Sequence, residues 1–137
     1  MNERSLTTLF GKYLEKHPRQ DTETYEIKMC RGSLAFSQVQ PHQIDGLQAS
    51  LAGLWYKISD STWGTTEKHR FTFKKPFDGI FIKSKRAYVV AIFYSPRKYK
   101  AAVLIRVEEF IKLRDTWKKK SIKLEELDKF KFETFYL

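Results

Sequence analysis

The sequence lacks the features of several common protein classes. Its 137 residues include one cysteine, Cys30, so no internal disulfide can form, and no Cys/His cluster has the spacing of a zinc site. The longest apolar run, residues 87–94, has eight residues, against the ~20 that a membrane-spanning helix needs. The first ten residues show no basic stretch followed by an apolar core, as a secretory signal would. Together these absences predict an intracellular protein, in its own cytoplasm or in that of a host if it is viral.

The sequence also lacks the short motifs of several enzyme classes. It contains no G-x-S-x-G elbow, no P-loop, no G-x-G-x-x-G turn and no H-E-x-x-H helix. Its three histidines, at positions 17, 42 and 69, offer little for a catalytic triad or for zinc chemistry. Serine hydrolases, P-loop enzymes, dinucleotide-dependent enzymes and zinc proteases are therefore not expected.

The most informative bulk property is positive charge, and it is distributed unevenly. Twenty-six Lys and Arg against sixteen Asp and Glu give a net charge of +10. The first fifty residues hold six basic and six acidic side chains, so the whole excess lies after residue 50. This asymmetry favours a polyanionic partner, with nucleic acid ahead of an anionic membrane. Ordinary solubilising charge is the alternative.

Hydrophobic periodicity predicts one α/β (α+β) domain over residues 1–137. A composition of 42% hydrophobic and 15% aromatic residues is too rich for a disordered chain. We expect helices at 3–16, capped by Asn2, and from Pro41 to Gly53, and a third helix at 108–117. The expected strands are 24–30, 54–58, 79–83, 87–94 and 101–107, with 79–83 and 87–94 forming a hairpin through 84–86. Residues 59–76 show no clear period and are expected to form a loop or irregular hairpin.

The first candidate for chemistry is the triplet Glu26-Ile27-Lys28 in the expected strand 24–30. Strand alternation places a carboxylate and an ammonium group on one face, about 6.5–7 Å apart along the chain. A carboxylate that holds a divalent metal and a Lys that orients the attacking water suit the cleavage of a phosphodiester. The alternative is a structural ion pair on a solvated strand.

Two further segments carry polar residues at the ends of expected elements. Asp78, in Pro76-Phe77-Asp78, leads into an apolar strand and could supply a second metal ligand, or it could be a turn residue. The segment 40–43 (QPHQ) opens the second helix, where side chains and free N–H groups can face phosphate or simply cap the helix.

A basic and aromatic stretch surrounds Asp78. Phosphate contacts from such a stretch would supply affinity without sequence preference, and exposed aromatic rings could stack on bases. The alternative is a solvated edge whose aromatic rings face the core. The predicted nucleic-acid-binding residues are Arg31, Lys68, Arg70, Lys74, Lys75, Lys83, Lys85 and Arg86.

Several of these segments resemble the PD-(D/E)XK nuclease superfamily, in particular RecU-type and archaeal-type Holliday junction resolvases. The likeness runs from Tyr25-Glu26-Ile27-Lys28 to residues 34–44 (LAFSQVQPHQI), because RecU-like proteins follow their E-x-K strand with a Ser/Phe-containing loop and a helix that begins near His-Gln. Residues 120–127 (KSIKLEEL) are similar to a segment near the RecU C-terminus, and residues 3–6 (ERSL) to the first helix of archaeal resolvases.

This resemblance implies a restriction-endonuclease-like fold, with a central mixed sheet flanked by helices, and a metal-dependent nuclease that uses Mg²⁺ or Mn²⁺. By the family pattern, Glu26 would be a metal ligand, Lys28 the base that positions water, Gln43 an active-site support and Glu3 an outer acid. The partners implied are branched or structured DNA and a second copy of the chain, since two symmetric cuts need two sites.

The sequence departs from the family pattern in one important place. The family has an Asp on a strand that precedes E-x-K, and no strand is expected here before Thr24. The stalk insertion of RecU has no counterpart either. We hypothesise that Asp78 supplies the missing metal ligand from another strand. If no acid fills the place, the chain is a non-catalytic nucleic-acid-binding module, and a structural or protein-interaction domain with incidental charge is the third alternative.

Overall fold

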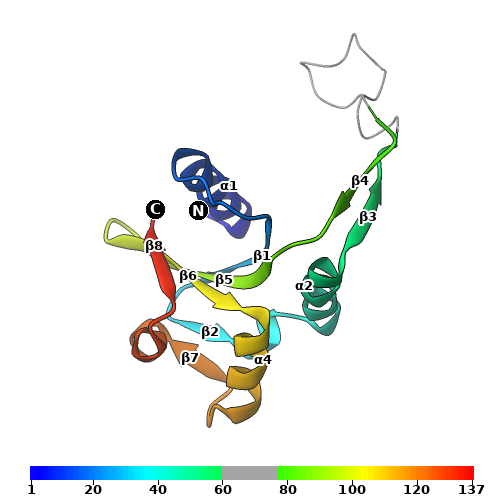
Figure 1. Cartoon of the computed structure of the whole chain (residues 1–137). Coiled ribbons are helices and arrows are strands. Elements are labelled where there is room, and N and C mark those ends of the chain that lie inside the picture. Colours follow the sequence, from blue (N-terminus) through cyan, green and yellow to red (C-terminus); the bar gives the residue numbers. More distant parts are fainter. Residues whose placement is uncertain (60–76) are drawn as a thin grey trace.

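The computed structural model describes residues 1–59 and 77–137, which form a mixed sheet with helices on both faces (Figure 1). The sheet has four strands in the order β1-β5-β6-β8, and β1 lies parallel to β5 while the other neighbours are antiparallel. The bounds of the strands are β1 Glu23–Cys30, β5 Arg86–Ser95, β6 Tyr99–Arg106 and β8 Glu133–Tyr136. The expected single α/β domain with a central mixed sheet flanked by helices is confirmed.

Strand β5 lies inside the sheet and is apolar on both faces. Residues 87–93 are all buried, as expected for a strand that is covered on both sides. Ala87, Val89, Ala91 and Phe93 face one hydrophobic core. Tyr88, Val90 and Ile92 face the other. The continuous apolar run in the sequence therefore fills two cores at once.

Of the described elements, helix α1 (Glu3–Lys16) alone covers the face of the sheet that carries Tyr88, and several elements cover the opposite face. Leu6 and Phe10 of α1 pack on the face that carries Tyr88, and Asn2 Oδ1 accepts a hydrogen bond from Ser5 N at 2.9 Å, as its expected capping role requires. The other face is covered by α2, α4 and several short elements (Figure 1). These elements are β2 (Ser33–Ala35), η1 (Phe36–Gln38), α2 (Pro41–Ala52), α4 (Val107–Thr116), β7 (Ser121–Lys123), α5 (Leu124–Leu127) and η3 (Asp128–Phe130).

The expected hairpin of strands 79–83 and 87–94 is wrong. Strand β4 (Gly79–Ile82) pairs instead with β3 (Leu54–Lys57), and the two form an antiparallel arm that projects from the body of the molecule (Figure 1). The connection 83–85 is held to other segments, because Ser84 N donates to Ser50 O and Lys85 N donates to Thr22 O, both at 2.8 Å. The chain is thereby redirected into β5, whose two edges are taken by β1 and β6.

The arm carries exposed aromatic side chains whose rings lie close to two glycines. A Cβ atom on Gly53, whose φ is +117°, would lie 2.5 Å from Cζ of Phe81, and one on Gly79 would clash with the Trp55 ring. Trp55 and Phe81 face each other across the two strands and are both more than 60% exposed. Glycine at positions 53 and 79 therefore leaves room for the two rings.

The C-terminal segment contains strands that hydrophobic periodicity did not predict. The apolar residues of the tail from Lys118 onward, Leu124, Leu127, Phe130 and Phe132, predict that it packs on the core. Leu127 is buried and Leu124 and Phe132 pack against the core, but Phe130 is 46% exposed. Strands β7 and β8 have three and four residues, too few for alternation to be distinguished from chance. None of the described helices is long and apolar enough to cross a membrane.

An ion-pair network ties the start of β1 to β5 and β8. Arg19 Nε donates to Glu23 Oε1 at 2.9 Å, and Arg19 Nη2 donates to Glu133 Oε1 at 2.9 Å. Arg86 donates from Nε to Glu23 Oε2 at 2.9 Å and from Nη2 to Asp21 Oδ2 at 2.8 Å. The Glu23 side chain is only 1% exposed. It is therefore a buried carboxylate held between two guanidinium groups.

The network predicts an acid-sensitive contribution to stability. Burial acts to raise the pKa of Glu23, but hydrogen bonds from Arg19, Tyr25 and Arg86 outweigh it and hold the pKa below its ordinary value. We expect Glu23→Gln to lower the free energy of unfolding by about 2 kcal/mol at pH 7, because it removes the buried carboxylate that accepts charge-assisted hydrogen bonds from Arg19 and Arg86. Urea unfolding at several pH values measures this difference.

The sign of the pH dependence follows from the lowered pKa. The contribution of Glu23 is fully present above its ordinary pKa and is lost as the pH falls through the lower, folded-state value. The gap between wild type and Glu23→Gln should therefore narrow in acid. Glu15→Gln, an exposed carboxylate on α1, is the control and should behave as wild type. A gap that stays constant down to pH 2 would contradict this account.

Candidate functional site at the edge of strand β1

Strand β1 is an edge strand, and side chains satisfy its outer backbone groups. It pairs with β5 on one side only. On the other side Met29 N donates to Glu3 Oε2 at 3.1 Å, and Met29 O accepts from Gln38 Nε2 at 3.2 Å. Gln38 Oε1 accepts in turn from Ala35 N at 3.0 Å. These contacts close part of the edge against pairing with another strand and bring polar side chains from α1 and η1 to it.

Glu26 and Lys28 lie on one face of β1 and contact each other. Alternation places them on the same face as Cys30, towards the core beneath α2, while Tyr25, Ile27 and Met29 face α1. Lys28 Nζ lies 3.3 Å from Glu26 Oε1. Lys28 is buried, at 8% exposure, whereas the Glu26 side chain is 29% exposed. The expected common face is therefore confirmed. A buried ammonium group lies beside a partly exposed carboxylate.

Glu3 reaches the same strand from the opposite face of the sheet. It is the first residue of α1, and its carboxylate accepts the hydrogen bond from Met29 N described above. Steps of 100° along the helix place Glu3 at the margin of the apolar stripe and Glu15 on the solvent side. Both positions are confirmed, since Glu3 is half-buried and Glu15 is exposed. Glu3 thus bonds to the residue that follows Lys28 in β1 and holds the strand edge in place.

Gln43 lies in the first turn of α2 and helps to cap the helix, whose N-cap residue is Gln40. Its Oε1 accepts from Gln40 N at 2.9 Å, which is the reciprocal half of a capping box. Helix α2 packs against β1 and β5, so Gln43 starts the helix that lies over the face carrying Glu26. His42 is exposed beside it. The structure shows Gln43 in a capping contact. Its implied role as an active-site support stays a prediction.

Asp78 lies away from Glu26. It immediately precedes β4, and its backbone oxygen accepts from Ile58 N at 2.8 Å where the arm joins residues 60–76. That end of the arm projects far from β1 (Figure 1). The structure therefore does not bring Asp78 and Glu26 together at one metal. The reason is the pairing of β4 with β3, which sets the direction of the arm.

The donor atoms for a divalent cation are limited in the described part of the chain. Among those residues, no group of three or more His, Cys, Asp and Glu side chains is placed to hold a metal. Mg²⁺ sites in proteins use one or two carboxylates and complete their shell with water and substrate phosphate. Glu26, partly exposed at the strand edge, fits as one such carboxylate. The described residues fit a site that depends on the substrate for its remaining ligands.

Cys30 lies at the end of the same strand and is chemically shielded. It is 1% exposed, and burial, together with the nearby negative charge of Glu3, raises the pKa of its thiol to about 12. A thiol so placed stays protonated near neutral pH and is a poor nucleophile. Its position fills the core at the end of β1.

The basic residues predicted to bind nucleic acid are placed differently from one another. Arg31 follows β1 and is exposed, where it lines a hollow with Tyr94. Lys83 and Lys85 are exposed between β4 and β5. Arg86, by contrast, is paired with Asp21 and Glu23, so its charge is largely neutralised within the protein. The remaining predicted residues, Lys68, Arg70, Lys74 and Lys75, lie outside the described residues.

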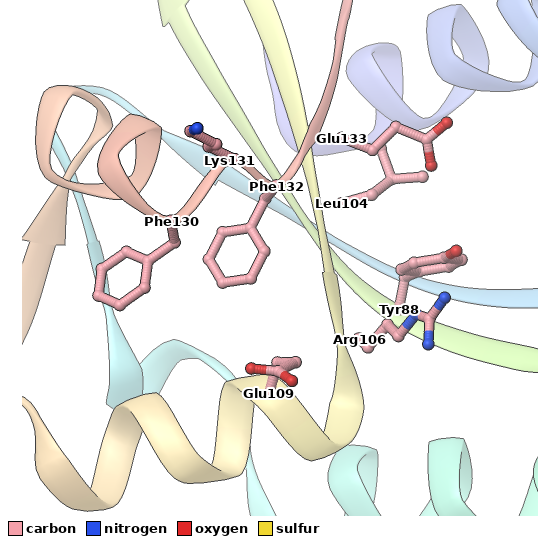
Figure 2. Close-up of a pocket in the computed structure, with 8 residues that line it drawn as sticks. All are labelled: Tyr88, Leu104, Arg106, Glu109, Phe130, Lys131, Phe132 and Glu133. Carbon is pink, nitrogen blue, oxygen red and sulfur yellow. The ribbon is translucent and has the colours of Figure 1, made fainter.

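A pocket of about 360 Å³ lies elsewhere in the molecule, between the end of β6, the start of α4 and the turn before β8. Figure 2 shows Phe130 and Phe132 side by side on one side of it, Tyr88 and Arg106 on the other, and Glu109 below. None of the predicted catalytic residues lines this pocket, and its charges are of both signs. It does not overlap the β1 edge.

Sequence reasoning missed Gln38, which joins η1 to β1. Nothing local distinguishes this residue from Gln40 and Gln43 in the same short run. Its role depends on Met29 O, nine residues earlier in the chain, which only the fold places within reach. The sequence signal available was the resemblance to the segment that follows the E-x-K strand in RecU-like proteins.

Comparisons with known proteins found no match to this chain among protein-family models, curated proteins or solved structures. The resemblance to junction resolvases therefore rests on the segments quoted above. The chemistry of the β1 edge rests on the geometry of its residues.

The contact between Glu3 and β1 predicts a measurable protection of one amide. We expect Glu3→Ala to speed hydrogen exchange at Met29 N about 10- to 100-fold, because a buried hydrogen bond to a charged acceptor is lost. Amide exchange followed by NMR reports this directly. Glu15→Ala, an exposed site on the same helix, should leave the rate unchanged. Equal exchange at Met29 in wild type and Glu3→Ala would show that Glu3 does not hold the strand edge.

Proposed function

We propose that this protein is an endonuclease that cuts structured DNA, with a Holliday junction as its expected substrate, and that the cut is made at the edge of β1. The observation that carries this proposal is the contact between Glu26 and Lys28, 3.3 Å apart on an edge strand, with the carboxylate accessible and the ammonium group buried beside it. The net charge of +10 supports a polyanionic substrate.

The two side chains have complementary tasks in hydrolysis of a phosphodiester. The Glu26 carboxylate would hold a divalent metal at the phosphate that is cut. The Lys28 side chain would orient or deprotonate the attacking water and steady the negative charge that grows on the phosphate oxygens. Packing around Lys28 fixes its position before substrate binds, so little reorganisation is needed when the charge develops.

We expect Mg²⁺, or Mn²⁺ in its place, to bind at Glu26 together with the DNA phosphate. When bound there, the metal would lower the pKa of water and neutralise charge on the phosphate. Glu3, the predicted outer acid, has one carboxylate oxygen bonded to Met29 N, next to Lys28 in the chain. We also propose that the protein acts as a homodimer, because paired nicks in two strands of a junction need two sites.

A second candidate is a non-catalytic nucleic-acid-binding module that keeps the same surface. The position of Asp78 favours it, because the acid expected to complete the metal site lies at the far end of the arm (Figure 1). This candidate shares the positive charge and the fold with the first. Only cleavage distinguishes the two.

The test incubates a labelled four-way junction and a linear duplex of the same sequence with the protein, with and without Mg²⁺. The proposal expects paired nicks on the junction that require Mg²⁺. Glu26→Gln should lower the cleavage rate at least about 100-fold, because it removes the carboxylate that would hold the metal. Junction binding by Glu26→Gln should stay within about threefold of wild type, since phosphate contacts supply the affinity.

Asp78→Asn is the matched control, since it makes the same isosteric change in an acid that the structure places elsewhere. It should cut at the wild-type rate. Loss of cutting in Asp78→Asn would restore Asp78 as a metal ligand and contradict the placement described above. Binding without any cutting by the wild-type protein, in either metal, would favour the non-catalytic module.

A further inference from the structure

A groove of about 590 Å³ lies between the start of α2 and the end of α4, on the face of the sheet opposite α1. Its apolar wall is formed by Phe36, Val39, Pro41 and Trp117. Trp117 is held in place, because its Nε1 donates to Ser121 O at 3.1 Å and its ring meets Phe130 edge-on, 6.0 Å between centroids. The groove therefore contains a fixed, partly exposed aromatic ring and further apolar surface.

The rim of the same groove is positively charged. Arg114, Lys118, Lys119 and Lys120 line it, and within the described part of the chain no acidic side chain does so. Arg114 is paired with Asp115 at 3.1 Å, while the three lysines that follow Trp117 are exposed. Helix α2 begins at this rim, and the positive end of its dipole adds to the field. The groove is thus complementary to an anionic ligand that also has apolar surface.

The short helix η1 connects the groove to the β1 edge. Ser37 and Gln40 line the groove, and Gln38, between them in the chain, donates to Met29 O beside Lys28. The start of η1 is itself fixed to the groove, since Phe36 N donates to Lys120 O at 3.1 Å. The groove and the β1 edge are thus joined by η1.

We propose that this groove binds an unpaired strand of DNA next to the site of cutting. In a duplex the base faces are stacked on one another, so an apolar wall gains nothing from them. In an unpaired strand the base faces are free to contact Trp117 and its neighbours while the phosphates contact the lysines. Among junctions of the proposed class, one with a single-stranded gap at its branch point would then be bound more tightly than a fully paired one.

The binding part of this proposal stands on the groove, and only the part about cutting rests on the function proposed above. Binding is therefore tested without metal. The probes are a labelled oligothymidylate of about 12 nucleotides, within the range of known single-strand sites, and an abasic oligomer of the same length. Wild-type protein should bind the oligothymidylate at least about 10-fold more tightly, because only that probe has bases to stack. Trp117→Ala should bind both probes equally.

The lysines are tested by salt dependence, with a matched pair of variants. Lys118→Gln/Lys119→Gln should reduce the slope of log K against log salt by about 1.4, since each phosphate contact on a single strand contributes about 0.7. Lys120 is left in place because its backbone holds Phe36. Lys12→Gln/Lys16→Gln removes the same charge from exposed positions of α1, on the opposite face, and should leave the slope unchanged.

The outcomes separate the groove from the nuclease. Equal affinity of wild type for the two probes, or equal slope changes in the two lysine pairs, would overturn the groove; both measurements remain decisive even if Trp117→Ala fails to fold. Groove-dependent binding without cleavage of any DNA would support the groove and overturn the nuclease. Where cutting occurs, a four-way junction with a single-stranded gap at its branch point should be cut at least about 10-fold faster than a fully paired one, and the reverse order would overturn the role of the groove in cutting.

Discussion

The parallel pairing of β1 with β5 is the constraint on which the rest of the structure depends. Because β5 is apolar on both faces, it must lie inside the sheet with cover on each side. Its other edge is taken by β6, with which it forms an antiparallel pair. Strand β1 is therefore left as the sheet edge, and polar side chains on it can reach solvent and still be held by the core.

The same constraint explains why residues from distant segments meet at β1. An edge strand has unpaired N–H and C=O groups, and these must be satisfied. Glu3 comes from the first helix and Gln38 from η1, and each bonds to the backbone of Met29. The contacts cover part of the edge and bring an acid and an amide to the residue that follows Lys28. The side chains that satisfy the backbone of β1 are therefore also polar neighbours of the proposed site.

Much of this arrangement could be predicted from the sequence, and the failures have a common origin. The face shared by Glu26 and Lys28 follows from alternation in one strand, and the inward position of Glu3 follows from the period of one helix. The hairpin expected at 84–86 and the metal ligand expected at Asp78 both required knowing which strand pairs with which. Ile80 and Phe81 are as apolar as the residues of β5, yet they lie exposed on an arm with β3. Local hydrophobicity does not determine which strands pair.

The sequence by itself determined the helices, the longer strands, the polar and apolar sides of β1 and the uneven charge, because each depends on residues close together in the chain. Only the tertiary structure decided the strand order, the direction of the arm, the bond from Gln38 to Met29 and the position of residues 117–120 beside η1. These depend on segments up to about a hundred residues apart. Their pairing is fixed by the competition of all strands and helices for one buried sheet, which no single segment records.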